Sequence, residues 1–304
     1  MRQPADTCVV GIGETTLDQI GVGVASFGRP AELATFTVQA GGGVATALAT
    51  VAALGGKARL LTRLGDDAFG RTAIQRLRSF GVDTSLVLVE QGRMSPTRLV
   101  VIDDETRGRR EHFTRGDVAP LEPSEIPTAL LQGASVLLVD GSEPEVQVAV
   151  ARRAKSLGIQ VLLDARDFVA QAGELWRLAD VVVASERVAS ETVSSDDMPR
   201  ALRELQKRGP KIAVVTLGEE GAVALVGTQF VREQGLSLDV VDKLGSGDAF
   251  RGALAWALGQ DWPFERALAL ANATGALNCR ALGGQSGIPS LDEVLSAAGI
   301  TAAR

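Results

Sequence analysis

The sequence predicts an α/β fold, with a mostly parallel central sheet between two layers of helices and a small β-sheet lid. From residue 135 onward, short and fully apolar runs alternate with amphipathic stretches. Strands that are apolar along their whole length are typical of a parallel sheet covered on both faces. Two segments, at about 14–40 and 86–116, instead show short strand-like runs and interrupt this order. We expect these two insertions to form the lid together.

The composition narrows the functional class. The 304 residues suffice for a large core, and no repeat or interdomain linker is evident, so we expect a single domain over 1–304. The formal net charge of −6 argues against binding to nucleic acid or to an anionic membrane. No apolar run approaches membrane-spanning length and the N-terminus lacks a signal-peptide pattern, which indicates a cytoplasmic protein.

Cysteine and histidine usage bears on two kinds of site. Cys8 and Cys279 both lie in apolar runs, so we expect buried free thiols in a reducing compartment. With one histidine, His112, and two isolated cysteines, the chain lacks the ligands of a His/Cys zinc cluster. A Ser-His-Asp catalytic site is disfavoured for the same reason.

The first expected strand, 8–12, leads to a candidate ligand contact. It ends in a Gly-x-Gly pair, a weak dinucleotide-binding signal because Thr16 stands where the third glycine of that pattern would be. Asp18 follows shortly after the carboxyl end of this strand, where α/β proteins place ligands. A solvated loop position is the alternative for this carboxylate.

A turn of three glycines, Gly41 to Gly43, precedes a small-residue helix expected over 44–54. Glycines before a helix N-terminus allow a ligand to approach the backbone closely, whereas a flexible linker rarely abuts so regular a helix. A strand is then expected over 58–64, followed by a helix that ends at Gly81.

The second insertion is rich in arginine. We expect strands at 86–89, 97–102 and 110–114. The arginines of this segment are Arg93, Arg98, Arg107, Arg109, Arg110 and Arg115. A solvated strand face is the usual explanation of such charges, and a lid that recognises an anion is the alternative, with Arg98 as the candidate substrate contact.

The second half of the chain provides most of the expected core. Strands are expected at 135–139, 159–163, 180–184 and 211–217, and helices at 143–157, 198–208 and 261–279.

The stretch Val240 to Phe250 carries the strongest chemical signal. A β-rich run ends at Asp242, the glycines Gly245 and Gly247 flank a serine, and an apolar helix follows from Asp248. Unpaired N–H groups and the helix dipole make such a turn a favourable site for an anion. Asp248 beside it is either a helix cap or the base that takes a proton from a group attacking a bound phosphate.

These motifs together resemble the ribokinase (PfkB) family of carbohydrate kinases over nearly the whole chain. The C-terminal signature of that family, an Asp-Thr-Thr-Gly-Ala-Gly-Asp type stretch, is matched by Asp242 to Asp248. Its N-terminal signature is matched by Gly41 to Gly43 with the following helix, and by the Arg-Leu-Gly-Asp-Asp-Ala-Phe-Gly stretch at 63–70. The resemblance implies a ribokinase-like α/β/α sandwich, and it is strongest to the branch that holds ketohexokinase and sulfofructose kinase.

The resemblance implies ATP-dependent transfer of the γ-phosphoryl group to a hydroxyl of a small sugar or sugar acid. Asp248 would take the hydroxyl proton, and Gly245, Ser246 and Gly247 would form the anion hole for the phosphoryl group. The implied sugar contacts are Asp18, Gly42, Gly43 and Thr46.

Nucleotide and ion sites follow from the same resemblance. The residues implied at the nucleotide site are Ser185, Thr216, Gly218, Gly221 and Asn272. Glu186 would help to hold Mg²⁺. The carbonyl groups of Asp242 and Leu244, with the loop around Gly284, match positions where some relatives hold a monovalent cation, so potassium is a further expected ion.

Several residues depart from the family pattern. Lys243 stands where threonine is usual, and Thr46 and Arg251 stand where asparagine is frequent. Val188 replaces a glutamate that orders magnesium-bound water, so we expect Glu186 to substitute for it. Gly141-Ser142 lies where sulfosugar enzymes carry an arginine, which weakens a sulfofructose assignment.

Alternatives to a kinase of simple sugars stay open. The lid arginines favour an acceptor that is already phosphorylated or sulfonated, and the changes at Ser185 and Val188 favour a non-catalytic sugar- or nucleotide-binding relative. A Rossmann-type dehydrogenase is disfavoured because the Gly-x-Gly pair lacks the third glycine of the dinucleotide-binding motif. Since relatives pair through such lids, we expect a homodimer. The candidate seam residues, which otherwise face the sugar, are Val22, Val24, Phe27, Phe36 and Val38.

Overall fold

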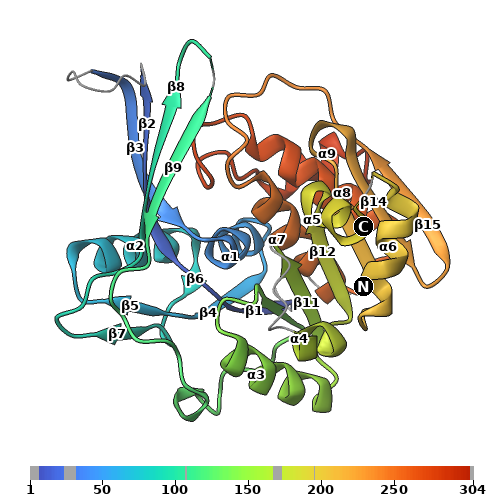
Figure 1. The fold of residues 1–304 in the computed structure, drawn as a ribbon, viewed down its shortest axis with the longest axis horizontal. Coiled ribbons are helices and arrows are strands. Elements are labelled where there is room, and N and C mark those ends of the chain that lie inside the picture. The colour runs from blue at the N-terminus through green and yellow to red at the C-terminus, as the bar shows by residue number, and fades with distance from the viewer. Residues whose placement is uncertain (1–6, 24–31, 107, 167–172, 195, 302–304) are drawn as a thin grey trace.

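The computed structural model describes residues 7–23, 32–106, 108–166, 173–194 and 196–301. A large sheet of nine strands in the described residues forms the centre, in the order β15-β14-β13-β12-β11-β10-β1-β4-β6 (Figure 1). Its strands are β1 (Cys8–Ile12), β4 (Lys57–Leu61), β6 (Val82–Asp83), β10 (Val136–Val139), β11 (Gln160–Ala165), β12 (Val181–Ser185), β13 (Ile212–Thr216), β14 (Gly221–Val226) and β15 (Gln229–Gln234). Only the hairpin β14–β15 and its junction with β13 are antiparallel.

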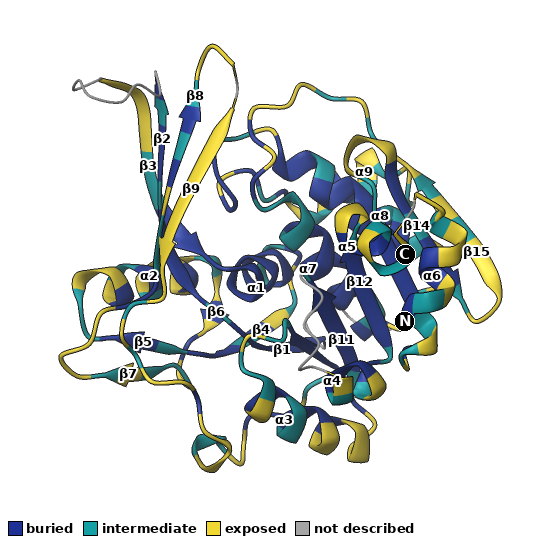
Figure 2. Ribbon diagram, viewed as in Figure 1, coloured by how far each residue is buried: buried dark blue, intermediate teal, exposed yellow. Residues whose placement is uncertain are grey.

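Helices cover both faces of this sheet, because alternate side chains of each buried strand point to opposite sides. One face packs against α1 (Gly43–Ala53), α2 (Ala68–Phe80), α7 (Ser246–Gly259), α8 (Phe264–Asn278) and α9 (Leu291–Ala297). The other face packs against α3 (Pro144–Ser156), α4 (Gly173–Leu178), α5 (Glu186–Val193) and α6 (Met198–Lys207). The predicted three-layer α/β/α architecture is therefore confirmed, and Figure 2 shows the central strands largely buried.

The two strand-rich segments meet in one small sheet that projects from the body (Figure 1). Its order is β3-β2-β8-β9, formed by β2 (Thr16–Gly23), β3 (Leu33–Gly41), β8 (Thr97–Asp103) and β9 (Arg109–Thr114). We call this sheet the lid. Its β2–β8 junction is parallel and the other two are antiparallel.

Three strand predictions were wrong. The single strand expected over 58–64 is split between β4 and a short β5 (Arg63–Gly65), which leaves the central sheet. The strand expected at 86–89 is β7 (Leu88–Glu90), and it pairs in parallel with β5 instead of joining the lid. The run before Asp242 is not a strand, because the amides of Val241 and Asp242 both bond to the Cys279 carbonyl.

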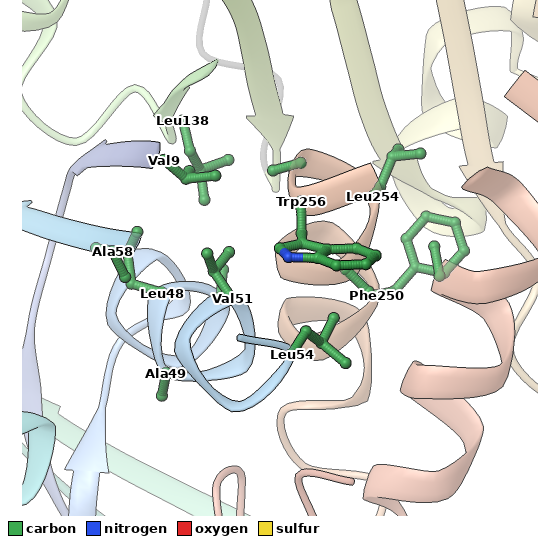
Figure 3. Close-up of a cluster of buried hydrophobic side chains, with 14 of the residues drawn as sticks. Val9, Leu48, Ala49, Val51, Leu54, Ala58, Leu138, Phe250, Leu254 and Trp256 are labelled. Carbon is green, nitrogen blue, oxygen red and sulfur yellow. The ribbon is translucent and has the colours of Figure 1, made fainter. Parts of the chain in front are cut away.

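Helices α1 and α7 approach each other closely at the centre of the molecule. Gly252 of α7 lies against the backbone of Ala47, so that a Cβ atom on Gly252 would overlap Ala47. Around this contact, apolar side chains of both helices, including Leu48, Leu254 and Trp256, fill the space below the sheet (Figure 3). Dense packing of this kind holds the N-termini of α1 and α7 at a set separation. Both N-termini carry predicted site residues.

Among the helices that the structure describes, none combines the length and the apolar character needed to cross a bilayer. Cys8 and Cys279 are both buried and free, as predicted.

Candidate active site

Asp248 lies in the first turn of α7, beside the predicted glycine turn. The residue that caps this helix is Gly245, which adopts φ 73°, and Asp248 is the third residue of the helix. The cap alternative for Asp248 is therefore excluded. No side chain caps α7, and its first N–H, that of Ser246, donates to the Lys243 carbonyl at 3.4 Å, so an anion would bind at the following N–H groups of this turn.

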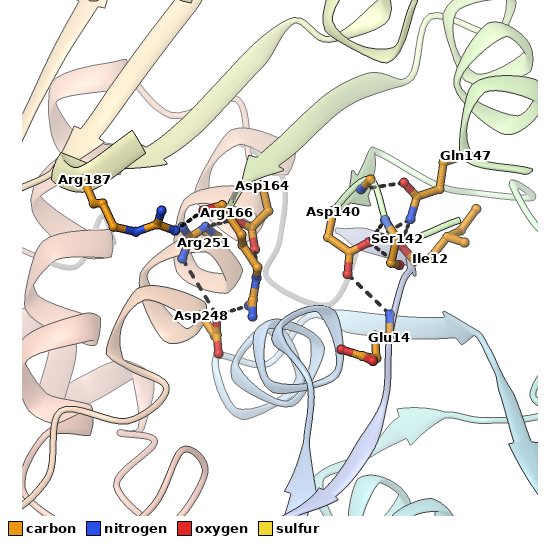
Figure 4. A network of polar contacts seen from close by, with 11 residues as sticks. Ile12, Glu14, Asp140, Ser142, Gln147, Asp164, Arg166, Arg187, Asp248 and Arg251 are labelled. Atoms are coloured by element: carbon orange, nitrogen blue, oxygen red, sulfur yellow. Dashed lines mark hydrogen bonds and ion pairs between the residues drawn. The ribbon is translucent and has the colours of Figure 1, made fainter. Parts of the chain in front are cut away.

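The Asp248 carboxylate belongs to a cluster of two acids and two arginines (Figure 4). Arg166, which follows β11, donates from Nη2 to Asp248 Oδ1 and from Nε to Asp164 Oδ2 at 2.7 Å. Arg251 of α7 pairs through Nε with Asp164 Oδ1 at 2.6 Å and lies 3.7 Å from Asp248 Oδ1. Asp164 is almost fully buried. Burial opposes the charge of Arg166, but Asp248 and Asp164 outweigh it and raise the pKa of this guanidinium.

Arg166 and Asp164 were missed as site residues in the sequence. Asp164 is visible only as the end of a strand, and Arg166 meets Asp248 across 82 positions of the chain. No local pattern marks such a pair, because the contact depends on the side-by-side placement of β11 and α7.

A cavity of about 150 Å³ opens on one side of the glycine turn. Four of the five predicted nucleotide contacts line it, together with two residues of the predicted anion hole: Thr216, Gly218, Gly221, Asn272, Ser246 and Gly247. Ser185 does not line the cavity, but it stands beside Thr216 at the adjacent ends of β12 and β13 and caps α5. Lys243 lines the same cavity, with its side chain largely exposed and 3.9 Å from Glu219.

The predicted acceptor contacts lie on the lid and at the start of α1. Asp18 on β2 is buried, accepts a hydrogen bond from the Thr16 hydroxyl at 2.6 Å and lies 4.0 Å from Arg98 of β8. Its carboxylate covers Gly41, where a Cβ atom would overlap it. Gly42, with φ 87°, caps α1 at Gly43, again without a side-chain cap.

Thr46, a predicted sugar contact, is bonded to the loop at 283–287, and its contact with a sugar stays a prediction. Its hydroxyl accepts a hydrogen bond from the Gln285 side chain at 3.4 Å, and the residue is buried. Gln285 in turn donates its backbone N–H to Gln39 of β3 at 2.7 Å. Thr46 therefore helps to join α1, the lid and the loop at 283–287.

The predicted cation ligands converge at the base of this loop. The carboxylate of Asp242 accepts a hydrogen bond through Oδ2 from the backbone N–H of Gly283 at 2.8 Å. The carbonyls of Leu244 and Gly284 both accept from Nδ2 of Asn278, at 3.3 and 3.1 Å. Each carbonyl oxygen has a second lone pair that could coordinate a cation, and the potassium site stays a prediction.

The donor set suits magnesium held mainly through phosphates. Glu186 is exposed at the start of α5, next to Ser185. Within the described residues, no group of three or more acidic, histidine or cysteine side chains gathers around one point. Mg²⁺ commonly binds through one or two carboxylates, substrate phosphates and water, which a single exposed glutamate beside the nucleotide strands fits.

Comparison with known proteins identifies the family. The model of the pfkB family carbohydrate kinases matches residues 6–291. The chain belongs to this family. It is 30% identical over 269 residues to an ATP-dependent ribose-1-phosphate kinase from Halopiger xanaduensis, covering 84% of each chain. It is also 30% identical to fructokinase-1 from Oryza sativa subsp. japonica, covering 94% of this chain and 96% of the relative.

Solved structures of pfkB-type kinases share the fold. Ribokinase from Arabidopsis thaliana, complexed with ribose and ATP, superposes with a TM-score of 0.86 over 98% of this chain and 100% of that one, at 22% identity. The predicted family and the ribokinase-like fold are thus confirmed, whereas the narrower branch with ketohexokinase stays a prediction.

Replacement of Asp18 by asparagine is expected to stabilise the protein at neutral pH while it weakens acceptor binding. Burial raises the pKa of the Asp18 carboxyl, although Arg98 and the Thr16 hydroxyl oppose the rise. A raised pKa means that the folded protein holds the proton more tightly than the unfolded chain, so the ionised carboxylate costs folding free energy at pH 7. The gain in Tm should disappear below about pH 4, where the carboxyl is neutral in both states.

The control for this variant is Asp83→Asn at the far edge of the sheet. Burial acts on Asp83 too, but hydrogen bonds from Ser85 and Arg59 outweigh it and lower the pKa of that carboxyl. Asp83→Asn should therefore lose stability at pH 7 instead of gaining it.

For Asp18→Asn we expect the acceptor KM to rise about 10- to 100-fold, because the variant loses a charged hydrogen bond to the acceptor. A Tm gain that persists at low pH would contradict the assignment.

Proposed function

We propose that the protein transfers the γ-phosphoryl group of ATP, as its magnesium complex, to a hydroxyl of a small sugar or sugar derivative. One observation carries the proposal. The Asp248 carboxylate stands at the uncapped N-terminus of α7 next to a cavity lined by Ser246 and Gly247, and Arg166 links it to Gly43 at the start of α1. A base beside an anion hole, with room for a nucleotide on one side, is the arrangement that phosphoryl transfer requires.

In the proposed reaction, Asp248 accepts the proton of the acceptor hydroxyl while that oxygen attacks the γ-phosphorus. The new oxygen–phosphorus bond forms as the bond from phosphorus to the β,γ-bridging oxygen breaks, and ADP leaves. The N–H groups of the turn at 245–247 and of the first turn of α7 stabilise the charge on the transferring group. Glu186 and the ATP phosphates would hold Mg²⁺, which would supply further charge neutralisation.

The lid forms part of the proposed acceptor-binding site. Ile20, Val100 and Ile102 on the inner face of the lid pack with Leu244 and Leu282 of the body, next to Asp18. We propose that the chain acts as one domain in which the lid covers the acceptor and excludes water, which limits ATP hydrolysis.

The test is ADP release from ATP in the presence of neutral sugars, sugar acids, phosphosugars and nucleosides. Acceptor-dependent ADP release supports the proposal. A protein that binds ATP but releases ADP with none of these acceptors would be a non-catalytic relative, which is the second candidate function. The changes at Ser185 and Val188 favour that candidate, but Val188 of α5 is fully buried and packs in the core.

The lid also supports a proposed homodimer, now with a revised seam. Phe36 and Leu99 lie on the outer face of the lid, since their strand partners Gly21 and Gln19 alternate with Asp18 along β2. Their exposed fractions are 54% and 43%. Val22 instead packs with the inner apolar group, and Val24 and Phe27 lie outside the described residues.

Phe36→Asp is expected to convert the dimer to a monomer at micromolar concentration, because it places a charge in the apolar seam. Phe113→Asp is the matched control. Phe113 is 65% exposed on the same lid, but it stands opposite Arg98 and so belongs to the inner face. Light scattering after gel filtration measures the mass. A monomeric wild-type protein, or equal effects of the two variants, would refute the proposed interface.

We further propose a cytoplasmic location, which suits a reaction that consumes ATP and a chain with two free thiols.

A further inference from the structure

Arg166 occupies the acceptor side of the proposed active site. Its guanidinium covers Gly43 at the start of α1, where a Cβ atom would overlap Nη2 and Cζ. The same group donates to Asp248 at the start of α7 and to Asp164 at the end of β11 (Figure 4). About a third of the side chain, 34%, is exposed. The guanidinium thus stands between the predicted base and the glycine turn that is predicted to hold the sugar.

This position conflicts with catalysis unless the acceptor changes it. Arg166 donates to Asp248 Oδ1, and Arg251 lies 3.7 Å from the same oxygen. An acceptor hydroxyl has to reach this carboxylate in order to give up its proton. Acceptor binding must therefore draw the guanidinium away from Asp248, at least in part.

A guanidinium drawn away from Asp248 needs another anion. Asp164 cannot supply a second full pairing, because its Oδ1 already pairs with Arg251 at 2.6 Å. Helix N-termini disfavour a cation, and Arg166 lies near the N-termini of both α1 and α7. Hydroxyl groups of a neutral sugar cannot replace the negative charge of Asp248 as a partner of the guanidinium, whereas a carboxylate or phosphate can. Arginine binds both of these groups through paired hydrogen bonds.

The neighbouring lid arginines are less suited to this task. Arg98 lies between Asp18 at 4.0 Å and Glu111 at 3.5 Å. Arg109 pairs with the same Glu111 at 2.8 Å. Both arginines keep Glu111, which has no proposed part in the reaction, as a partner when the acceptor binds, so neither gains charge compensation from an anionic acceptor in the way that Arg166 does.

We propose that the acceptor carries an anionic group, a carboxylate or a phosphate, and that Arg166 binds this group and thereby releases Asp248 to accept the hydroxyl proton. The inference rests on the proposed kinase function and adds a class of acceptor and a specificity-determining residue to it. The uncapped first turn of α1 at Gly43 supplies N–H groups that suit the same anion.

The experiment measures kcat and KM for matched acceptors: neutral sugars, the corresponding sugar acids and the corresponding sugar phosphates. For the wild-type protein we expect kcat/KM to be about 10- to 100-fold higher for one of the anionic sets than for the neutral set. The set that responds distinguishes a carboxylate from a phosphate. Arg166→Gln should reduce this preference to about the neutral level, and Arg166→Lys should keep part of it.

Two further arginine variants serve as references. Arg152→Gln changes an exposed arginine of α3 that pairs with Glu174, and it should leave the preference unchanged. Arg98→Gln tests the lid directly, and a loss of preference there with none in Arg166→Gln would overturn the assignment. Thermal unfolding and ATP binding check that each variant is folded.

The assay distinguishes failure of this inference from failure of the proposed kinase function. ADP release with neutral sugars at the same or higher efficiency, in the wild-type protein and in Arg166→Gln alike, would overturn the anionic acceptor and leave the kinase intact. ADP release with no acceptor of any class would overturn the kinase function, and this inference with it.

Discussion

Asp248→Asn is expected to lower kcat by about 10²- to 10⁴-fold, the usual contribution of a general base. Asparagine keeps the size of the side chain but cannot take the hydroxyl proton. The uncapped N–H groups of α7 and the cavity beside them stay in place, so ATP should still bind. Turnover under saturating ATP and acceptor, together with nucleotide affinity, measures the two effects separately.

The control for this variant is Asp292→Asn. Asp292 also lies in the first turn of a helix, α9, and it is exposed. Its loss tests the contribution of a first-turn carboxylate to helix stability, without any part in the reaction. Since Asp248→Asn also removes a partner of Arg166, the unfolding temperature must be recorded. Near-normal turnover in a folded Asp248→Asn protein would rule out Asp248 as the base.

The parts of the fold that repeat a local rule were predictable from the sequence. Fully apolar runs such as 181–184 are typical of strands buried on both faces, so they placed the parallel sheet and its helical layers. The small-residue helix α1 was expected within one residue of its observed ends, because glycines bound it on both sides. The glycine turn before Asp248 was equally clear.

The parts that depend on distant partners were not predictable. Val240 and Val241 have strand-forming side chains, but they belong to none of the strands in the described residues, and their segment is tied to Cys279 instead. The hairpin β14–β15 escaped notice, although its turn contains Gly227 in a left-handed conformation. Propensity describes a residue, whereas strand pairing needs a partner whose position only the complete fold determines.

The site shows the same division. The glycines and Asp248 could be predicted because their chemistry is local to one turn. The pairing of Arg166 and Arg251 with Asp164 and Asp248 joins two elements that are adjacent only in the folded sheet. In our proposal, that cluster determines which acceptors can reach the predicted base, and no sequence motif indicated it.

Gly245→Ala is expected to impair both stability and catalysis, for two separable reasons. Gly245 has φ 73°, a conformation that costs a residue with a side chain about 1 kcal/mol. A Cβ atom there would also overlap the backbone of Gly284, which is not a flexible side chain that can move aside. The turn and the loop at 283–287 would have to separate, at a further cost of about 1–3 kcal/mol.

Gly227→Ala isolates the first of these costs. Gly227 has φ 58° in the turn between β14 and β15, and a Cβ atom there meets nothing within 4 Å. This variant should lose about 1 kcal/mol of stability and keep full turnover, because it strains the backbone without moving the site.

The difference between the two variants therefore measures the contact between the anion hole and the loop. Since Gly245 begins the turn whose N–H groups are proposed to bind the transferring phosphoryl group, a shift of this turn should lower kcat by about 10²- to 10³-fold, as the loss of an oxyanion-hole donor does. Denaturant unfolding and steady-state kinetics measure the two effects. If Gly245→Ala and Gly227→Ala behave alike in both assays, the close approach of Gly284 has no part in shaping the anion hole.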